Sequence, residues 1–444
     1  MLGDDEQRLF RHLAVFVDGT DLDTAERVAT DLGLSIDPGT ALARLVDASM
    51  LQATFTSSAE TRYRMLETLR AFGLDRLAAA GDMDVATAQL IRWAVELARW
   101  FDETAATDDE AVADATLRRE SANVRAAWRA ARDGGQVDDA AAIVAGLFDA
   151  VMSRDLVEVR AWARELADDP LLRGRSRAAA VFGAAAYAAY AAGEQDTADA
   201  YARAGLAEGG DGVLHCRHAL AVSALARGAW YEAIEHCLSA EAVDDHRHGF
   251  SGMAALASAY AGDLDRARVF NARWLDEASS PSRRAWATYY QAEIENLAGR
   301  QELAELRYTQ AVTLGQRAGD TFVVGVATIG LANLRAVDGQ EREALARYRE
   351  VLELFARTGY WTHQWIALRN LATLLRRVDD DDAADLIEAA AAVATDAPAI
   401  PATSTQLARL MPARPQQSAR SPQPVPRRHE ILDVARRAIE RQLD

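Results

Sequence analysis

Aromatic side chains gather at two places in the chain where they could anchor a ligand. Such rings make strong contacts because they remove a large apolar surface from water and fill pockets at the centre of interfaces. Arginines on the same predicted helices, Arg284 among them, could meet an acidic ligand. The alternative is that aromatic residues at helical spacing only fill the core. His363 lies in the second cluster, and the candidate ligand-binding residues are Trp286, Tyr289, Tyr290, Arg335, Tyr360, Trp361, Trp365 and Arg369.

Histidine and cysteine concentrate between residues 215 and 248, where a metal site is one hypothesis. Zinc binds Cys and His at close spacing, and His215 and His218 can share one face of a helix. The spacings match no zinc signature, and Cys237 falls at a packing position of the repeats described below. The alternative is therefore core cysteines and surface histidines. The metal candidates are His215, Cys216, His218, His236, Cys237, His246 and His248.

Motifs of enzymes are not evident in the sequence. Paired carboxylates, a nucleophile elbow, an H-E-x-x-H motif and a glycine-rich phosphate loop do not stand out. The chain contains no lysine, so all 49 basic residues are arginine. This composition excludes a P-loop lysine and a Schiff-base lysine from the chain. We therefore expect a non-enzymatic protein without a cofactor.

The overall charge argues against direct binding to nucleic acid. The formal net charge is −18, whereas affinity for DNA comes largely from basic side chains that neutralise phosphates. The N-terminus carries no apolar segment typical of a signal peptide, and the alanine-rich run 178–192 is too short to span a bilayer. With only two cysteines, a reducing compartment is expected. The sequence thus predicts a soluble cytoplasmic protein without a membrane partner.

The first eighty residues predict three helices, a hairpin and a closing helix. Asp37 and Pro38 supply an N-cap and a first-turn proline for the third helix, which includes Leu42 and Leu45. Gly81 follows the closing helix as a C-terminal cap. This order is typical of a winged helix. The predicted helices are 6–17, 23–32, 38–46 and 67–80, and the predicted strands are 51–55 and 62–65.

A repeat of about 34 residues runs through the rest of the chain. Its glycines are spaced by 35, 34, 37 and 40 residues, each is followed five residues later by alanine, and a degenerate copy starts at Asp379. Glycine ends one helix in the left-handed conformation, and alanine lets two helices approach closely. This period predicts a tetratricopeptide-like superhelix, in which the first helix of each pair lines the concave face. The repeat glycines are Gly193, Gly228, Gly262, Gly299 and Gly339.

The predicted fold is thus all-α, with an N-terminal winged-helix unit, a small β-hairpin and a helical-repeat superhelix. Residues 397–428 contain seven prolines and predict a linker. The segment after residue 400 is locally basic, with eight arginines against four acidic residues. Its last helix could dock on the acidic body, bind a partner or have no role. The predicted domains are 1–82 winged helix, 83–170 helical connector, 171–396 repeats, 397–428 proline-rich linker and 429–444 amphipathic helix.

Several phrases of the N-terminal third resemble one family. These are EQRLFRHLAVFVDGTDLDTAERVA, LARLVDASML, YRMLETLRAFGLDRLAAAG and, at 118–135, RRESANVRAAWRAARDGG. They resemble the segment after the ATPase core of large bacterial STAND-type transcriptional regulators, which include LuxR-type relatives. The resemblance implies a winged helix followed by a repeat sensor. It does not extend to an ATPase core, because the chain has no P-loop motif.

The expected function is therefore a sensor and interaction module of such a regulator. The resemblance implies that a peptide, protein or small-molecule inducer occupies the concave groove and alters contact with a separately encoded P-loop ATPase. Three alternatives stay open: a stand-alone scaffold, a metal-binding sensor or enzyme using 215–248, and a direct DNA reader. The third helix offers only Arg44 as a cation and also carries Asp47, which disfavours DNA reading.

Overall fold

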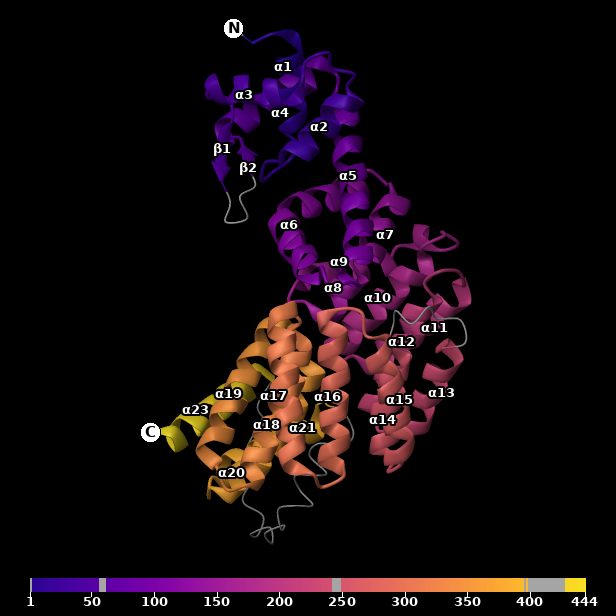
Figure 1. Cartoon of the computed structure of the whole chain (residues 1–444), viewed down its shortest axis with the longest axis vertical. Helices are drawn as coiled ribbons and strands as arrows, with labels where there is room; N and C mark the ends of the chain where they lie inside the picture. Colours follow the sequence, from indigo (N-terminus) through magenta and orange to yellow (C-terminus); the bar gives the residue numbers. More distant parts are fainter. Residues whose placement is uncertain (1, 56–60, 242–248, 395–396, 398–427) are drawn as a thin grey trace. The chain divides into compact units, whose positions relative to one another are not determined.

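The structure is a computed structural model that describes residues 2–55, 61–241, 249–394, 397 and 428–444. The chain divides into two compact units. The N-terminal unit comprises Met1–Phe101 and Ala115–Gly146, and the repeat domain comprises Asp102–Asp114 and Leu147–Asp444. The predicted linker, 397–428, lies outside the described residues except at its two ends. Figure 1 shows the order of the helices along the chain.

The N-terminal unit contains the predicted winged-helix order. Strands β1 and β2 pair antiparallel, with Ala53 opposite Tyr63, and helices α5 and α6 continue from this unit into the repeat domain. The elements are α1 (Asp4–Leu13), α2 (Leu22–Asp31), α3 (Pro38–Asp47), β1 (Gln52–Phe55), β2 (Thr61–Arg64), α4 (Glu67–Ala80), α5 (Met83–Ala105), α6 (Glu110–Asp133) and α7 (Val137–Gly146).

Local signals set most of these boundaries. The Asp37 side chain accepts a hydrogen bond from the Thr40 backbone N–H, and Pro38 occupies the first turn of α3. Gly81 ends α4 with a φ of +74°, which confirms the predicted cap. Helix α1 ends at Leu13, four residues before its predicted end. The chain turns there, and Phe16 packs edge-on against Trp93 of α5, with ring centroids 5.5 Å apart.

A buried ion pair ties the hairpin to α6 within the N-terminal unit. Arg62 of β2 and Glu120 of α6 are 2 % and 4 % exposed. The Arg62 guanidinium contacts both Glu120 carboxylate oxygens and also donates to the Asp18 and Gly19 carbonyls. The Asn123 side chain donates to Glu120 and to the Gly19 carbonyl. One polar cluster therefore connects β2, the segment before α2, and α6.

The repeat domain is a series of helix pairs. The first helices of the pairs are α10, α12, α14, α16, α18 and α20. Its elements are α8 (Phe148–Ser153), α9 (Val157–Ala167), the 3-10 helix η1 (Pro170–Leu172), α10 (Ala178–Ala191), α11 (Gln195–Glu208), α12 (Val213–Ala226), α13 (Trp230–Glu241), α14 (Phe250–Tyr260), α15 (Leu264–Glu277), α16 (Pro281–Leu297), α17 (Gln301–Ala318), α18 (Thr321–Val337), α19 (Glu341–Thr358), α20 (Trp361–Arg377), α21 (Asp381–Val393) and α23 (Arg428–Leu443).

The repeat pattern matches the observed turns. All five repeat glycines have positive φ, and Asp379 adopts a φ of +62° at the degenerate sixth turn. The alanine five residues after each turn is at most 1 % exposed in all six pairs. Small side chains at this position let the paired helices pack closely. The alanines are Ala198, Ala233, Ala267, Ala304, Ala344 and Ala384.

The repeat domain also packs its late helices against its early ones. Every residue of α10 is buried, and α10 contacts α20 although some 170 residues separate them. The Thr362 hydroxyl donates to the Tyr190 carbonyl at 2.5 Å. The Thr321 hydroxyl donates to the Ser153 carbonyl at 3.3 Å. The helix pairs therefore close around an interior.

The C-terminal helix α23 docks on the last repeats. Ile431 and Ile439 are fully buried, and α23 contacts α19, α20 and α21. Arg441 pairs with Asp380 at 2.7 Å, where Asp380 also caps α21. Of the three roles considered for this helix, docking on the acidic body is the one observed. Within the described residues, no helix combines the length and the apolar character needed to cross a bilayer.

Breaking the Arg62–Glu120 pair should destabilise the N-terminal unit. Glu120→Ala leaves a buried guanidinium without its carboxylate, which costs about 3–5 kcal/mol. The check is urea unfolding of the full chain, followed by hydrogen exchange of peptides from residues 2–80. Arg64→Ala is the matched control because Arg64 pairs with Asp18 at the surface, and it should cost no more than about 1 kcal/mol. Equal losses for both variants would contradict the assigned role.

Candidate functional site

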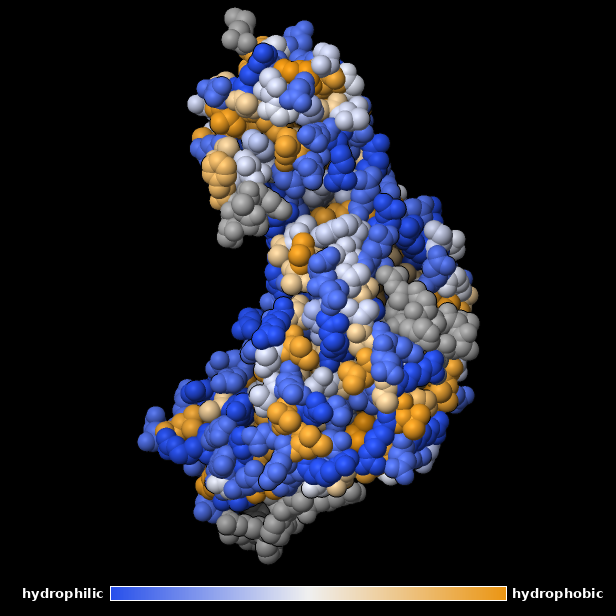
Figure 2. All heavy atoms as spheres, viewed as in Figure 1, coloured by the Kyte–Doolittle hydropathy of each residue, from blue (hydrophilic) through white to orange (hydrophobic). Residues whose placement is uncertain are grey.

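A cavity of about 200 Å³ lies within the repeat domain. Its walls come mainly from α8 and from all six first helices, α10 to α20, and α13 and α15 add one residue each, Trp230 and Trp274. The lining residues recur at 13, 10 and 6 positions before the repeat glycine, a spacing that places them on one helix face. Trp286, Tyr289, His218, Val222 and Tyr187 follow this register. Where it is visible in Figure 2, the outer face of α16 to α19 is mainly hydrophilic, in contrast to this interior.

Aromatic rings form most of the cavity wall. Trp286 is a centre of these contacts, with ring centroids 5.3 Å from Phe322 and 5.6 Å from Tyr290. Tyr187 and Tyr190 contact each other at 5.5 Å, and α10 positions both. Rings at these distances stabilise one another beyond their burial of apolar area. The aromatic lining residues are Tyr187, Tyr190, Trp230, Tyr260, Trp274, Trp286, Tyr289, Tyr290 and Phe322, with His218 and His363.

A buried arginine lies beside the cavity and is surrounded by carboxylates. Arg154 is fully buried and donates to Glu110 at 2.5 Å. Its guanidinium lies 3.3 Å from Asp114 and 3.8 Å from Asp149. Burial disfavours the charged guanidinium, yet the nearby carboxylates raise the pKa of Arg154 above its usual value. Arg154 therefore stays charged and organises the acidic groups.

Two of the acidic groups, Asp149 and Asp320, line the cavity. Asp320 caps α18 by accepting from the Phe322 and Val323 N–H groups, and its second oxygen accepts from Trp286 Nε1 at 2.9 Å. Burial raises the pKa of Asp320 to about 7, although Arg154 and the Val323 N–H act to lower it. Burial also raises the pKa of Asp149. Both carboxyls are therefore easier to protonate than usual.

A second polar group adjoins the wall along α16. Glu293 is 1 % exposed and accepts from the Tyr308 hydroxyl at 2.5 Å and the Tyr260 hydroxyl at 2.9 Å. Burial raises its pKa, although these hydroxyls act to lower it. In the described part of the chain, no cationic side chain lies within ion-pair distance of Glu293. Glu293 also occupies the register position six residues before Gly299.

The predicted aromatic candidates divide between the cavity and the core. Trp286, Tyr289, Tyr290 and His363 line the cavity. Burial lowers the pKa of His363 to about 3, so its imidazole is neutral. The other three aromatics of the second cluster lie outside the lining. Tyr360 and Trp365 are buried, Tyr360 stacks on Phe322 at 4.4 Å, and Trp361 begins α20.

The predicted arginines lie outside the cavity lining and contact other parts of the repeat domain. Arg335 pairs with Glu305 and Glu343. Arg284 pairs with Asp108 at 2.5 Å. Arg369 donates to the Ala391 carbonyl at 3.3 Å. The first two guanidiniums are therefore engaged with carboxylates of the protein itself.

The histidine and cysteine candidates mostly pack among other side chains. His215 stacks on Phe148, with ring centroids 3.8 Å apart, and His218 is 9 % exposed. Neither is therefore one of the surface histidines that the alternative to a metal site predicted. Cys216 donates to the Ala179 carbonyl at 3.2 Å, and burial raises its pKa to about 12, which disfavours a metal-binding thiolate. His236, on α13, lies 3.8 Å from Glu232.

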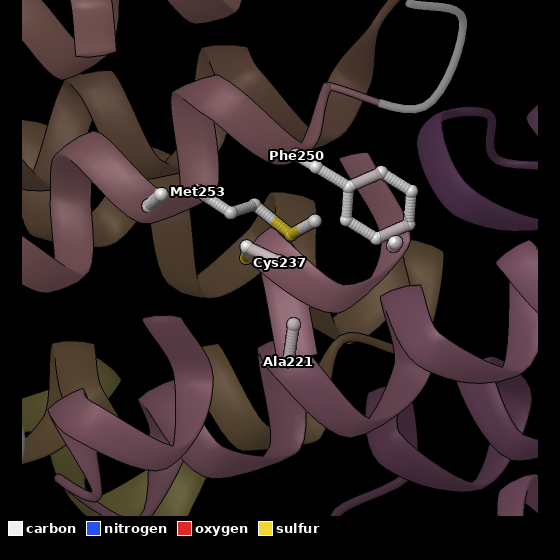
Figure 3. Packing of buried hydrophobic residues seen from close by; sticks show 6 residues of the cluster. Ala221, Cys237, Phe250 and Met253 are labelled. Atoms are coloured by element: carbon white, nitrogen blue, oxygen red, sulfur yellow. The ribbon is translucent and has the colours of Figure 1, made fainter. Parts of the chain in front are cut away.

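Cys237 belongs to an apolar cluster. It packs with Ala221, Phe250 and Met253 (Figure 3), which confirms its predicted packing position in the repeat. His246 and His248 lie outside the described residues. Among the residues that are described, no three His, Cys, Asp or Glu side chains form a group suited to a metal ion.

Sequence reasoning missed most of the cavity. Asp149, Arg154 and Asp320 lie outside the repeat pattern or at its turns, and long-range packing alone brings them together. Tyr187 and Tyr190 were available from the repeat register, because they precede Gly193 by six and three residues and so continue the helix face on which Trp286 and Tyr289 precede Gly299 by thirteen and ten. Comparing the first helices position by position would have found them.

Comparisons with known proteins relate part of the chain to a winged-helix family and to proteins named as transcriptional regulators. Residues 2–78 match the family described as "Winged helix-turn-helix domain". Proteins named "Putative HTH-type transcriptional regulator" from Mycobacterium tuberculosis (strain ATCC 25618 / H37Rv) and from Mycobacterium bovis are 33 % identical to this chain over 173 residues. That match covers 38 % of this chain and 19 % of each relative. The chain thus spans about a fifth of the length of the curated relatives it matches.

The ionisation of Asp320 should make the effect of Asp320→Asn depend on pH. Between the unfolded pKa of 3.8 and the folded pKa of about 7, folding takes up a proton at Asp320. The stability contribution of Asp320 is thus greatest at low pH and is lost as the pH rises through 7. Asn resembles the protonated carboxyl, so the variant should gain stability relative to the wild type between pH 5 and pH 8. Urea unfolding at both pH values measures this difference, and a pH-independent difference would contradict it.

Proposed function

We propose that this chain is the winged-helix and sensor part of a STAND-type transcriptional regulator related to the LuxR-type proteins, with repeats of the tetratricopeptide type. The proposal depends above all on one observation, the cavity of about 200 Å³ that all six first helices line. Cavities lined by aromatic rings with a few polar groups are the usual form of small-molecule sites. The winged-helix match and the similarity to named regulators support the regulatory part.

In this proposal, a small ligand occupies the cavity and shifts the balance between two conformations of the module. A ligand acts in this way only if it binds one conformation better than the other. The route that we propose runs through Arg154 and Glu110, because Glu110 begins α6. The same helix carries Glu120, which holds Arg62 of the hairpin in the N-terminal unit. A change at the cavity wall is thereby transmitted along one helix.

The winged helix serves in this proposal as a contact for a P-loop ATPase rather than as a DNA reader. The exposed positions of α3 include Ala43, Arg44 and Asp47, a face poor in groups that read base edges. Arg44 already pairs with Glu6 at 2.6 Å. The ATPase belongs either to the same polypeptide or to a separate one. The proposed module is non-enzymatic, has no resident cofactor and acts in the cytoplasm.

The first test is recovery of the tagged chain from its native cell extract. Native mass spectrometry detects a bound small molecule, and peptide mass spectrometry identifies protein partners. We expect a small molecule in the wild type and its loss in Ile366→Trp, because Ile366 lines the cavity and the larger indole fills it. A P-loop ATPase among the partners supports the split regulator.

The matched control is Val269→Trp, which adds the same indole at a position that is 70 % exposed. This variant should keep the small molecule. Equal small-molecule content in wild type and Ile366→Trp would contradict the sensor role. Recovery of other proteins without an ATPase or regulator would favour the stand-alone scaffold.

A gel-shift assay tests whether the winged helix reads DNA. At physiological salt the full chain, with its net charge of −18, should not retard duplex DNA, because electrostatic attraction to phosphate is missing. Arg44→Ala should behave identically. A retarded band that weakens in Arg44→Ala would contradict the proposed use of α3 and favour direct DNA binding.

A further inference from the structure

The cavity wall has the electrostatic character of a cation site. The faces of aromatic rings carry negative potential and attract cations within about 6 Å of their centroids. Trp286, Tyr290 and Phe322 surround one part of the space, and Tyr187 and Tyr190 contribute from α10. Indole rings attract cations most strongly, and the cavity wall contains Trp230 of α13, Trp274 of α15 and Trp286 of α16.

Carboxylates outnumber arginines at one end of this wall. Two acidic side chains, Asp149 and Asp320, line the space, and Glu110 and Asp114 lie directly behind them around Arg154. Arg154 and the lining Arg283 are the cations that act on Asp149, and a third arginine, the buried Arg160, donates to the Arg154 carbonyl. A fifth acid, Glu293, is also buried on α16. It lies further from this acidic end, about 16 Å along the helix from Ser282, which contacts Glu110. The site therefore has a deficit of positive charge.

Asp149 is the carboxylate that remains available to a ligand. Its side chain is 36 % accessible and lines the cavity. The nearest guanidinium nitrogen is 3.8 Å away, and no donor among the described residues makes a hydrogen bond to its carboxylate. Asp320 differs, because three donors already occupy its oxygens.

The charge balance discriminates among ligand classes of similar size. An anion would meet Asp149 and Asp320 with only Arg283 to receive it, and like charges at short distance repel. A neutral molecule could donate a hydrogen bond to Asp149, but without the added strength that a charged donor brings to a carboxylate. A cation would restore the charge balance and donate hydrogen bonds to Asp149, whose ion pair with Arg154 is long. An engineered cavity of about 150 Å³ holds benzene, so a single substituted ring fits here.

We propose that the cavity binds a small organic cation, with an ammonium group against Asp149 and an apolar body about the size of a substituted benzene ring among Trp286, Tyr290 and Tyr190. This inference rests on the proposed sensor function and specifies its ligand class. Asp149 holds the ammonium end, the negative potential of the ring faces adds to that attraction, and the apolar body packs among the rings.

The test uses three probes of similar shape that differ in charge: 2-phenylethylammonium, 2-phenylethanol and 3-phenylpropanoate. Isothermal titration calorimetry on the full chain at pH 8 gives each Kd, and quenching of tryptophan fluorescence reports binding independently. We expect the ammonium probe to bind at least tenfold more tightly than the alcohol, and the carboxylate probe to bind least. Asp149→Asn should weaken ammonium binding about tenfold or more and leave alcohol binding within about threefold.

Two further variants make the result decisive. Asp265→Asn is the charge control, since Asp265 is 96 % exposed on α15, and it should leave all three affinities unchanged. Ile366→Trp should abolish binding of every probe that uses the cavity. Circular dichroism and thermal unfolding check that each variant folds. If Asp149→Asn does not fold, Ile366→Trp still tests whether the probes bind in the cavity.

The outcomes separate the cation inference from the sensor proposal. If the alcohol or the carboxylate binds as tightly as the ammonium probe and Ile366→Trp blocks it, the cation inference is overturned and the sensor proposal stands. Ammonium binding that survives both Asp149→Asn and Ile366→Trp also overturns the inference, because it occurs elsewhere. If no probe binds at millimolar concentration, the inference falls, and the small-molecule content of the native protein decides the sensor proposal.

Discussion

The repeat domain depends on the compensation of one buried positive charge. A guanidinium without access to water is tolerable only with carboxylates and hydrogen-bond acceptors around it, and Arg154 obtains these from the start of α6 and from α8. Glu110 in turn accepts from the Ser282 N–H at the start of α16. The termini of separate helices are thus held at one point. The surplus of acid that surrounds Arg154 also gives the neighbouring cavity its electrostatic character.

The repeats supply the other half of the cavity, through geometry rather than charge. Each first helix presents the same face inward, so one lining position recurs along the array. At six residues before the repeat glycine the wall has Tyr187, Val222 and Leu256 in successive pairs, and the same position of the fourth pair is Glu293, which adjoins the wall. A repeat fold therefore varies the chemistry of its interior by single substitutions at a fixed register. The repeat pattern thus sets both the regular backbone of the helix pairs and the positions at which the residues of the cavity wall vary.

Much of the fold could be predicted from the sequence because its signals are local. The caps at Asp37 and Gly81 and the six repeat turns follow from the conformational preferences of single residues. The site was only partly predictable. Trp286 and Tyr289 are visible as a cluster in the sequence, whereas Asp149 and Asp320 are separated by some 170 residues. Packing brings these two carboxylates together at the cavity, and no local sequence pattern around either residue predicts that position.

The closure of the helix pairs on one another has a consequence for how the domain can change. An open array of repeats tolerates the gain or loss of a pair, because each pair contacts only its neighbours. Here α20 packs against α10, and Thr362 donates to the Tyr190 carbonyl. Removal of one pair would separate these partners. The number of pairs between α10 and α20 is therefore fixed by geometry, and this domain should diversify by substitution within its pairs rather than by duplication of them.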